Sequence, residues 1–144
     1  MMHAALEQAR LAAARGEVPV GAVIVQNSVI IAASGNRVVE CDDPTAHAEM
    51  LVIRAACTAI GNARLNECDL YVTLEPCPMC ATAISFARIR RVYFGAYDPK
   101  GGGVEHGARI FHQPTCHHTP EVIGGLMEGE CGLLLKEFFK ERRG

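Results

Sequence analysis

Short runs of β-branched residues, each bounded by polar or turn-forming residues, predict the strands of this chain. Residues 18–25 and 29–33 form two such runs, and the three polar residues between them are typical of an antiparallel hairpin. Two further runs, at 69–74 and 91–94, have the composition of buried strands. A last, shorter strand is expected at residues 121–124.

Four other segments have the periodicity or the composition of helices. They cover residues 4–15, 46–60, 78–88 and 133–142. The first consists of strong helix formers, and Gly16 and Gly61 are placed to end the first two. The second has an apolar stripe made of Met50, Ile53, Cys57 and Ile60. Strands that alternate with helices in this order are typical of an α/β protein whose sheet is covered by helices.

Length and composition indicate a globular chain. The 144 residues suit one domain, and no repeat or linker divides residues 1–144. Hydrophobic residues make up 49% and charged residues 21%, a balance that excludes a disordered protein. The net charge of -2 does not indicate a nucleic-acid binder, although residues 88–144 carry nine basic against seven acidic residues. The C-terminal part of the chain is therefore its basic part.

The seven cysteines do not form a disulfide pattern, because their number is odd and they are scattered. The first fifteen residues lack the apolar core of a signal peptide, and no run approaches the roughly 18–20 apolar residues that span a bilayer. We therefore expect a cytoplasmic protein that meets no membrane and whose thiols are free or bound to metal.

Two short motifs, each at the start of a predicted helix, carry the residues suited to metal chemistry. In the segment 75–80, Glu-Pro-Cys-Pro-Met-Cys, Pro78 suits a first helical turn, which puts Cys77 at the N-cap and Cys80 one turn inside. Both sulfurs can then converge just beyond the helix terminus, where the positive end of the helix dipole favours thiolate.

The other motif places His47 and Glu49 two residues apart, on nearly opposite sides of a regular helix. They can share a site only if the N-terminus of their helix points at it. The segment Asp43-Pro44-Thr45, with Thr45 as N-cap, supplies such a start. Two helix N-termini are therefore expected to meet at one metal ion.

One histidine and two cysteines leave the fourth tetrahedral position of Zn²⁺ open for water, which is the arrangement of catalytic zinc sites. The carboxylate of Glu49 can then take a proton from that water. The set of His-x-Glu, 26 intervening residues and Pro-Cys-x-x-Cys matches the signature of the zinc nucleobase deaminases. The histidines of the glycine-rich segment 98–118 are interpreted as loop residues, because the site is complete without them.

Three alternatives stay open for the same residues. A free-base or nucleoside deaminase of the same fold would act on guanine or cytosine and would not depend on RNA. A non-catalytic, zinc-stabilised RNA-binding module would keep His47 and the thiols but has no use for a carboxylate at Glu49. A redox protein built on Cys77 and Cys80 would bind no zinc and would reduce disulfides.

From about residue 17 to residue 143, the sequence closely resembles the cytidine-deaminase superfamily and, within it, the bacterial tRNA-specific adenosine deaminases that act on the anticodon wobble adenine. The resemblance runs through segments 17–22, 36–37, 43–49, 71–77, 87–91, 94–96, 98–100 and 138–143. The zinc motifs are common to free-base deaminases, whereas the Asn36 region and the C-terminal Phe-Phe-x-x-Arg-Arg favour tRNA. The chain begins several residues later than is common in the family, which could shorten the first helix.

The resemblance implies a three-layer α/β/α sandwich with a mixed five-stranded sheet, a homodimer, and hydrolytic deamination of adenosine to inosine in the tRNA anticodon stem-loop. It implies that His47, Cys77 and Cys80 hold zinc and that Glu49 is the proton shuttle. The substrate contacts that it implies come from Val20, Asn36, Ala48, Lys100, Arg142 and Arg143.

Within this last set, Asn36 would hydrogen-bond the base or its ribose, Val20 and Ala48 would line the base pocket, and the three basic residues would meet phosphates. All except Ala48 have a plainer alternative: Val20 as strand core, Asn36 as a turn former, and the basic residues as a solvated face.

Overall fold

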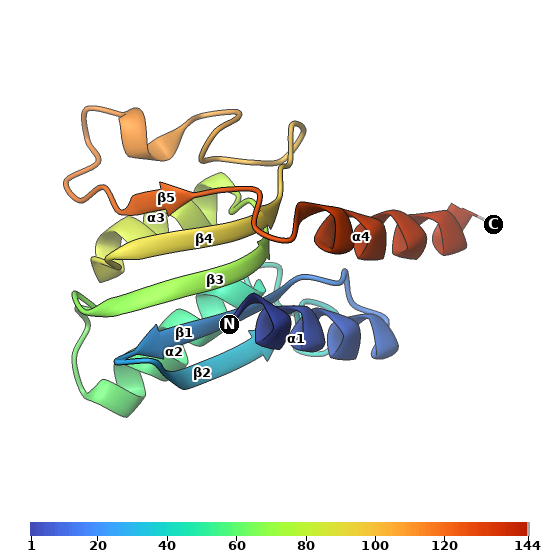
Figure 1. The fold of residues 1–144 in the computed structure, drawn as a ribbon, viewed down its shortest axis with the longest axis horizontal. Helices are drawn as coiled ribbons and strands as arrows, with labels where there is room; N and C mark the ends of the chain where they lie inside the picture. Colours follow the sequence, from blue (N-terminus) through green and yellow to red (C-terminus); the bar gives the residue numbers. More distant parts are fainter. Residues whose placement is uncertain (144) are drawn as a thin grey trace.

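Five strands form one mixed sheet in the order β2-β1-β3-β4-β5 (Figure 1). The computed structural model describes residues 1–143, Arg143 by its backbone alone. The strands are β1 (Gly21–Gln26), β2 (Val29–Gly35), β3 (Cys68–Leu74), β4 (Arg91–Ala96) and β5 (Glu121–Ile123). β1 is antiparallel to β2 and β3, whereas β3, β4 and β5 run parallel. The predicted hairpin and the mixed five-stranded sheet are confirmed.

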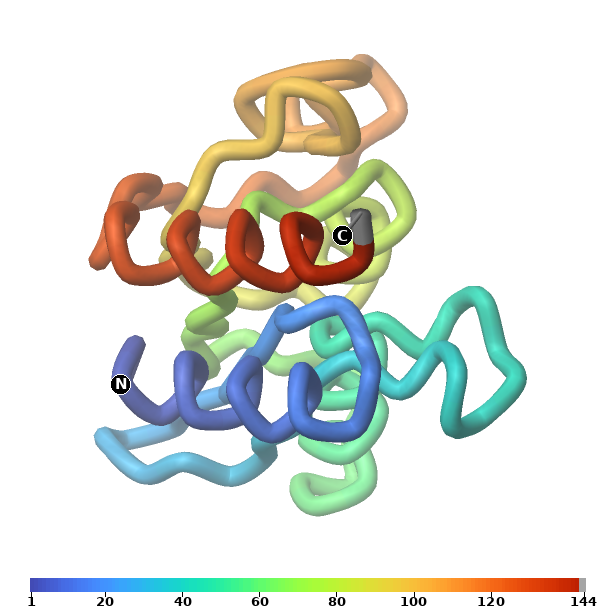
Figure 2. The backbone as a smooth tube through the Cα atoms, turned by 90° about the vertical axis from the view of Figure 1, so that its right-hand side faces the viewer, coloured from blue at the N-terminus to red at the C-terminus, as the bar shows by residue number. Residues whose placement is uncertain are grey.

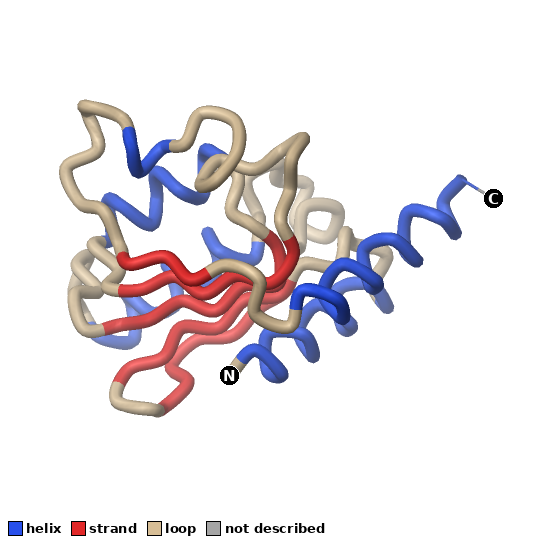
Figure 3. The backbone as a smooth tube through the Cα atoms, turned by 45° about the horizontal axis from the view of Figure 1, so that its top comes forward, coloured by secondary structure: helices blue, strands red, loops and turns tan. Residues whose placement is uncertain are grey.

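Helices cover both faces of the sheet, which gives the predicted three-layer α/β/α fold (Figure 3). They are α1 (Met2–Ala14), α2 (Ala48–Ile60), α3 (Pro78–Ala87) and α4 (Glu128–Arg143). α1 and α4 lie side by side on one face (Figure 2), and α2 and α3 pack together on the other. None of the helices within residues 1–143 has both the length and the apolar character that crossing a membrane requires.

The alanine-rich composition of α1 has a packing reason. Ala5, Ala9 and Ala12 are fully buried where α1 covers β1 and β2. A Cβ atom on Gly21 of β1 would lie 2.0 Å from the carbonyl oxygen of Ala5, so the helix backbone itself rests on the strand. Larger side chains at these positions would push the helix off the sheet. Small residues therefore fill this layer of the core in place of aromatic ones.

The opposite layer of the core is built from alternate residues of the two central strands. Leu70 and Val72 of β3 and Val92 and Phe94 of β4 are all 0% exposed and belong to one cluster with α2 and α3. Because the side chains of a strand alternate between its faces, this layer fixes which face α2 and α3 cover.

The start of α2 differs from the prediction. The helix begins at Ala48, and its N-cap is His47 instead of the predicted Thr45. The Thr45 hydroxyl donates instead to Oδ1 of Asp43, at 2.7 Å, and so shapes the turn before the helix. A short polar side chain that bonds its own turn is no longer available to cap the helix.

The apolar stripe predicted for α2 was also wrong. The buried face is made of Ala48, Glu49, Val52, Ile53 and Ala56. Of the predicted stripe, only Ile53 belongs to that face, and Ile60 is 36% exposed. The prediction counted only apolar residues. Because the buried face contains the carboxylate of Glu49, such a count favours a neighbouring stripe of the helix instead.

Helix α4 begins at Glu128, five residues before the predicted start at residue 133. Its first turn contains Glu128 and Glu130, and acidic residues there are favourable to the helix dipole. The apolar run that starts at Leu133 therefore marks the body of the helix, not its beginning.

Candidate metal centre and active site

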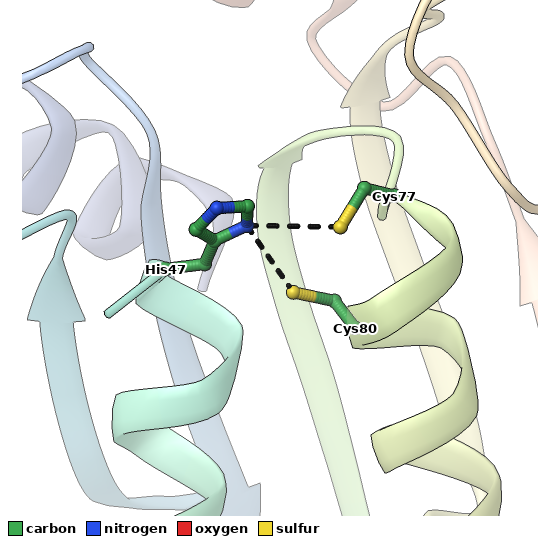
Figure 4. Close-up of side chains that lie close together, drawn as sticks. All are labelled: His47, Cys77 and Cys80. Atoms are coloured by element: carbon green, nitrogen blue, oxygen red, sulfur yellow. Dashed lines mark hydrogen bonds between the residues drawn. The ribbon is translucent and has the colours of Figure 1, made fainter. Parts of the chain in front are cut away.

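The first turns of α2 and α3 meet at one edge of the sheet and bring together three side chains that could hold a metal ion (Figure 4). Nδ1 of His47 lies 3.6 Å from Sγ of Cys77 and 3.5 Å from Sγ of Cys80. The three ligand atoms all lie within 4.8 Å of one another. The expected meeting of two helix N-termini is thus present in the structure.

These separations fit a zinc ion. Zinc–sulfur bonds of about 2.3 Å and zinc–nitrogen bonds of about 2.0–2.1 Å at tetrahedral angles place nitrogen and sulfur about 3.6 Å apart. That is the separation found between the His47 ring and both thiols. One imidazole with two soft thiol ligands suits zinc among the common biological cations.

The backbone leaves the two capping side chains free to face the metal. His47 and Cys77 are the N-cap residues of α2 and α3, both in extended conformation, and neither side chain bonds back to its own helix. Pro78 occupies the first turn of α3, where its missing N–H removes no helical hydrogen bond. Cys80, one turn further on, is 0% exposed. The predicted place of Cys77 at the N-cap is confirmed.

The thiols and the neighbouring carboxyl have displaced pKa values. A hydrogen bond from the Cys80 thiol, helped by the His47 ring, lowers the pKa of Cys77 to about 4. The same hydrogen bond and burial raise the pKa of Cys80. Burial also raises the pKa of Glu49 to about 7. Of these three groups, Cys77 alone has a pKa shifted toward its charged form, and its thiolate supplies negative charge where a cation would bind.

A cavity of about 730 Å³ opens above this cluster, with His47, Glu49 and Cys77 in its lining. Its other walls come from residues 16–20, the loop after β2, the ends of β3 and β4, and α4. They are Gly16, Glu17, Val18, Val20, Asn36, Val38, Val39, Pro44, Leu74, Glu75, Asp98, Gly101, Phe138, Phe139 and Arg142. The volume is that of an ordinary small-molecule site, and so it accommodates a nucleoside.

Asn36 and Val20, two of the predicted base contacts, lie in this lining. Oδ1 of Asn36 accepts the backbone N–H of Ala48 at 2.7 Å, which leaves the NH₂ group of the amide as the donor for a ligand. Ala48, the third predicted base contact, is fully buried and is not part of the lining. Its contribution to the site is the backbone N–H group that holds Oδ1 of Asn36.

The three predicted phosphate contacts are placed differently from one another. Arg142 lines the cavity, with its guanidinium 4.3 Å above the ring of Phe138 and Nη2 donating to the Gly16 carbonyl at 3.3 Å. Lys100 is exposed beside Gly101, outside the cavity lining. The side chain of Arg143 lies outside the described residues.

Two buried carboxylates in the lining were missed by the sequence analysis. Both oxygens of Glu17 accept backbone N–H groups, from Val39 at 3.1 Å and Glu40 at 2.9 Å. Burial acts to raise the pKa of Glu75, but the N–H groups and the histidine that it accepts from outweigh burial and hold that pKa below its usual value. The available signal was local: a glutamate directly before Pro76-Cys77 at the end of a strand.

Comparison with known proteins gives one consistent result. The family model of the cytidine and deoxycytidylate deaminase zinc-binding region matches residues 1–96. The tRNA-specific adenosine deaminase of Agrobacterium fabrum is 61% identical over 142 residues, which cover 99% of this chain and 93% of that protein. The protein of the same name from Bacillus subtilis is 47% identical over 142 residues, covering 99% and 88%.

Solved structures agree with this result. A structure from a study of A-to-I editing by tRNA:A34 deaminases at the wobble position matches with a TM-score of 0.92 and 62% identity, over 93% of this chain and 97% of that one. A guanine deaminase from Bacillus subtilis matches with a TM-score of 0.66 and 34% identity, over 99% and 92%. Chains that act on a free base thus share the fold.

Proposed function

The chain belongs to the cytidine and deoxycytidylate deaminase family, and from this premise we propose that His47, Cys77 and Cys80 hold its zinc ion and that Glu49 carries the protons. The reaction is hydrolytic deamination of adenosine to inosine at the anticodon wobble position of tRNA, by residues 1–144 acting as one domain. The observation that carries the proposal is the buried carboxyl of Glu49 beside a three-ligand cluster in the cavity.

In this reaction water adds to C6 of adenine, and the exocyclic amino group leaves as ammonia. His47, Cys77 and Cys80 would hold a zinc ion, which would supply a Lewis acid that lowers the pKa of the attacking water. Glu49 accepts a proton from the attacking water and delivers it to ring nitrogen N1. It then carries the remaining hydroxyl proton to the departing amino group. Burial suits this role, because it raises the pKa of the Glu49 carboxyl toward neutral pH, where a carboxyl can both accept and release protons.

The residues that line the cavity hold the base in place while Glu49 transfers protons. Asn36 donates its fixed NH₂ group to the base or its ribose, and Val20 contacts the base face. A base must leave its stack to reach the floor of such a cavity, and the unpaired bases of an anticodon loop can do so at small cost.

A substrate panel tests the function directly. Purified, zinc-loaded protein is offered an anticodon stem-loop with adenine at the wobble position, and separately guanine, cytosine and cytidine. We expect inosine and one equivalent of ammonia from the stem-loop alone. A stem-loop with guanine at the wobble position is the matched RNA control. Deamination of guanine or cytosine with an untouched stem-loop would replace the proposal by a free-base deaminase.

We expect phosphate contacts from the end of α4, because Arg142 lines the cavity and Arg143 follows it. Changing both to alanine should weaken stem-loop binding and reduce the slope of log affinity against log salt by about two units, roughly one per lost contact. Single-turnover rates at saturating RNA should change little, because the zinc cluster is untouched. Binding is measured at several salt concentrations.

The matched control for this pair removes two arginines elsewhere. Arg54 and Arg64 are both exposed, and neither lines the cavity. Their double alanine variant has the same change of net charge and should retain the wild-type slope. Equal slopes for all three proteins would show that the end of α4 makes no phosphate contact.

The resemblance to the family also implies a homodimer in the cytoplasm, and two features support this part of the proposal. Phe86, on the outer side of α3, is 79% exposed beside a second cavity of about 320 Å³, and a solvent-facing aromatic of this kind suits a protein contact. All seven cysteines are unpaired, as a reducing compartment requires. Sedimentation velocity should give about twice the 15.5 kDa mass of the chain; a particle of monomer mass would contradict the dimer.

A further inference from the structure

Glu75 is a buried carboxylate that accepts hydrogen bonds from four backbone N–H groups of one loop. Oε1 accepts from Asp98 at 3.0 Å, and Oε2 accepts from Val104, Glu105 and His106 at 3.2, 2.9 and 3.1 Å. The Nδ1 atom of the His106 ring lies 2.8 Å from Oε1. Glu75 is 2% exposed and follows β3 directly. One side chain therefore joins the loop 98–106 to the start of α3.

Glycines let the loop come this close. A Cβ atom on Gly102 would lie 2.4 Å from Oε2 of Glu75, and one on Gly103 would lie 2.5 Å from the nitrogen of Pro78. The N–H of Gly103 also donates to the Pro76 carbonyl at 2.8 Å. The backbone of the loop is thus packed directly against the carboxylate and against the first turn of the helix that carries both cysteines.

The first part of this loop is also a wall of the substrate cavity. Asp98 and Gly101 line the cavity, and Lys100 lies between them in sequence. Oδ1 of Asp98 accepts the N–H groups of Lys100 and Gly101, at 3.2 and 2.9 Å, so the turn is built on the residue that Glu75 holds. Any movement of Asp98 therefore moves this wall relative to the cysteines.

We propose that Glu75 is a positioning residue for the substrate: by holding the N–H of Asp98, it fixes the cavity wall 98–101 relative to Cys77. It acts through the loop and not on the reacting atoms. The inference rests on the proposed function and adds to it the residue that sets the width of the cavity on this side. A substrate wall displaced by about 1 Å can cost roughly 10²-fold in efficiency, so an anchor with this many bonds has a functional consequence.

The variant Glu75→Gln tests the contacts of Oε1, which accepts the N–H of Asp98 and lies beside the His106 ring. An amide oxygen facing Val104, Glu105 and His106 keeps those three bonds, but the amide NH₂ then faces the N–H of Asp98 and repels it. We expect the KM for the stem-loop to rise by about 10-fold to 100-fold, with single-turnover rates at saturating RNA within about twofold of wild type and full zinc content. Without RNA, hydrogen exchange at the Asp98 amide should speed up about tenfold.

Asp69→Asn is the matched control. Asp69 is also a buried carboxylate, 9% exposed, but it pairs with Arg90 near the start of β3, away from the cavity. This variant should lower the unfolding temperature and leave the KM unchanged. An equal rise of KM in both variants, or wild-type KM and Asp98 exchange in Glu75→Gln, would overturn the proposal. Loss of zinc from Glu75→Gln without faster exchange at the Asp98 amide would also overturn the proposal, because Glu75 would then support the metal ligands and not the cavity wall.

A second variant reaches the same loop from the other side. Gly102→Ala leaves Glu75 intact but places a Cβ atom against its Oε2 and against the Asp98 carbonyl oxygen, 2.5 Å away. It should raise the KM in the same way, and a wild-type KM here would contradict the proposal even if Glu75→Gln failed to fold. If the wild type deaminates guanine instead of the stem-loop, the proposed function fails, and the same KM comparison made with guanine decides the role of Glu75.

Discussion

Changing Glu49 to glutamine is expected to give a folded, zinc-loaded protein that binds the anticodon stem-loop but deaminates it roughly 10²–10⁴-fold more slowly, the range for loss of a general acid–base group. The amide keeps the shape of the side chain, which is 4% exposed, and it cannot accept and release protons. Single-turnover deamination at saturating RNA measures the chemical step, while elemental analysis and binding curves check zinc and RNA.

The control for this variant is Glu67→Gln, since Glu67 is an exposed carboxylate just before β3 and lies outside the cavity lining. It should behave as wild type in all three measurements. Near-normal turnover by the Glu49 variant would mean that the proton shuttle is another group. Loss of RNA binding together with turnover would instead assign Glu49 to substrate binding.

The metal cluster could be predicted from the sequence because the requirement is local and strict. Two sulfurs one helical turn apart, with Pro78 at the helix start, leave few backbone arrangements. The spacing of His47 and Glu49 makes sense only at a helix N-terminus, and the structure has His47 at that N-cap. Where the pattern was ambiguous by one or two residues, as with Thr45, the prediction of the cap was wrong. Helix boundaries depend on hydrogen bonds such as that of Thr45 to Asp43, which a spacing rule does not contain.

The walls of the cavity could not be predicted in the same way, because their contacts join residues far apart in sequence. Glu75 holds groups 23 to 31 residues away, and Arg142 donates to a carbonyl 126 residues away. A carboxylate that binds backbone N–H groups needs no particular side chain on the partner, so the loop carries no pattern that points to Glu75. The two glycines that allow the close approach look like ordinary loop residues until the structure is known.

The difference between a locally determined metal cluster and cavity walls built by long-range contacts explains why the fold serves more than one substrate. The guanine deaminase of Bacillus subtilis matches this chain over 99% of its length, so the fold is common to enzymes that act on a free base. In this chain the proposed zinc ligands and Glu49 come from the starts of two helices, whereas the walls come largely from loops and from α4. Loops change more easily than packed elements, which makes the walls the natural place for substrate choice.

Loss of one zinc ligand should abolish both the metal and the activity. In Cys80→Ser a hydroxyl replaces a fully buried sulfur, and a neutral oxygen is a poor substitute for thiolate at zinc. We expect less than about a tenth of the wild-type zinc by elemental analysis, no detectable inosine, and a lower unfolding temperature, because metal bound only to the folded state stabilises it.

Cys68→Ser is the matched control: Cys68 is also 0% exposed but lies outside the cluster, so that variant should lose stability and keep both zinc and turnover. Full zinc retention in Cys80→Ser would remove Cys80 from the ligand set. Zinc loss with retained deamination would refute the metal-assisted reaction itself, since Glu49 would then be activating water alone.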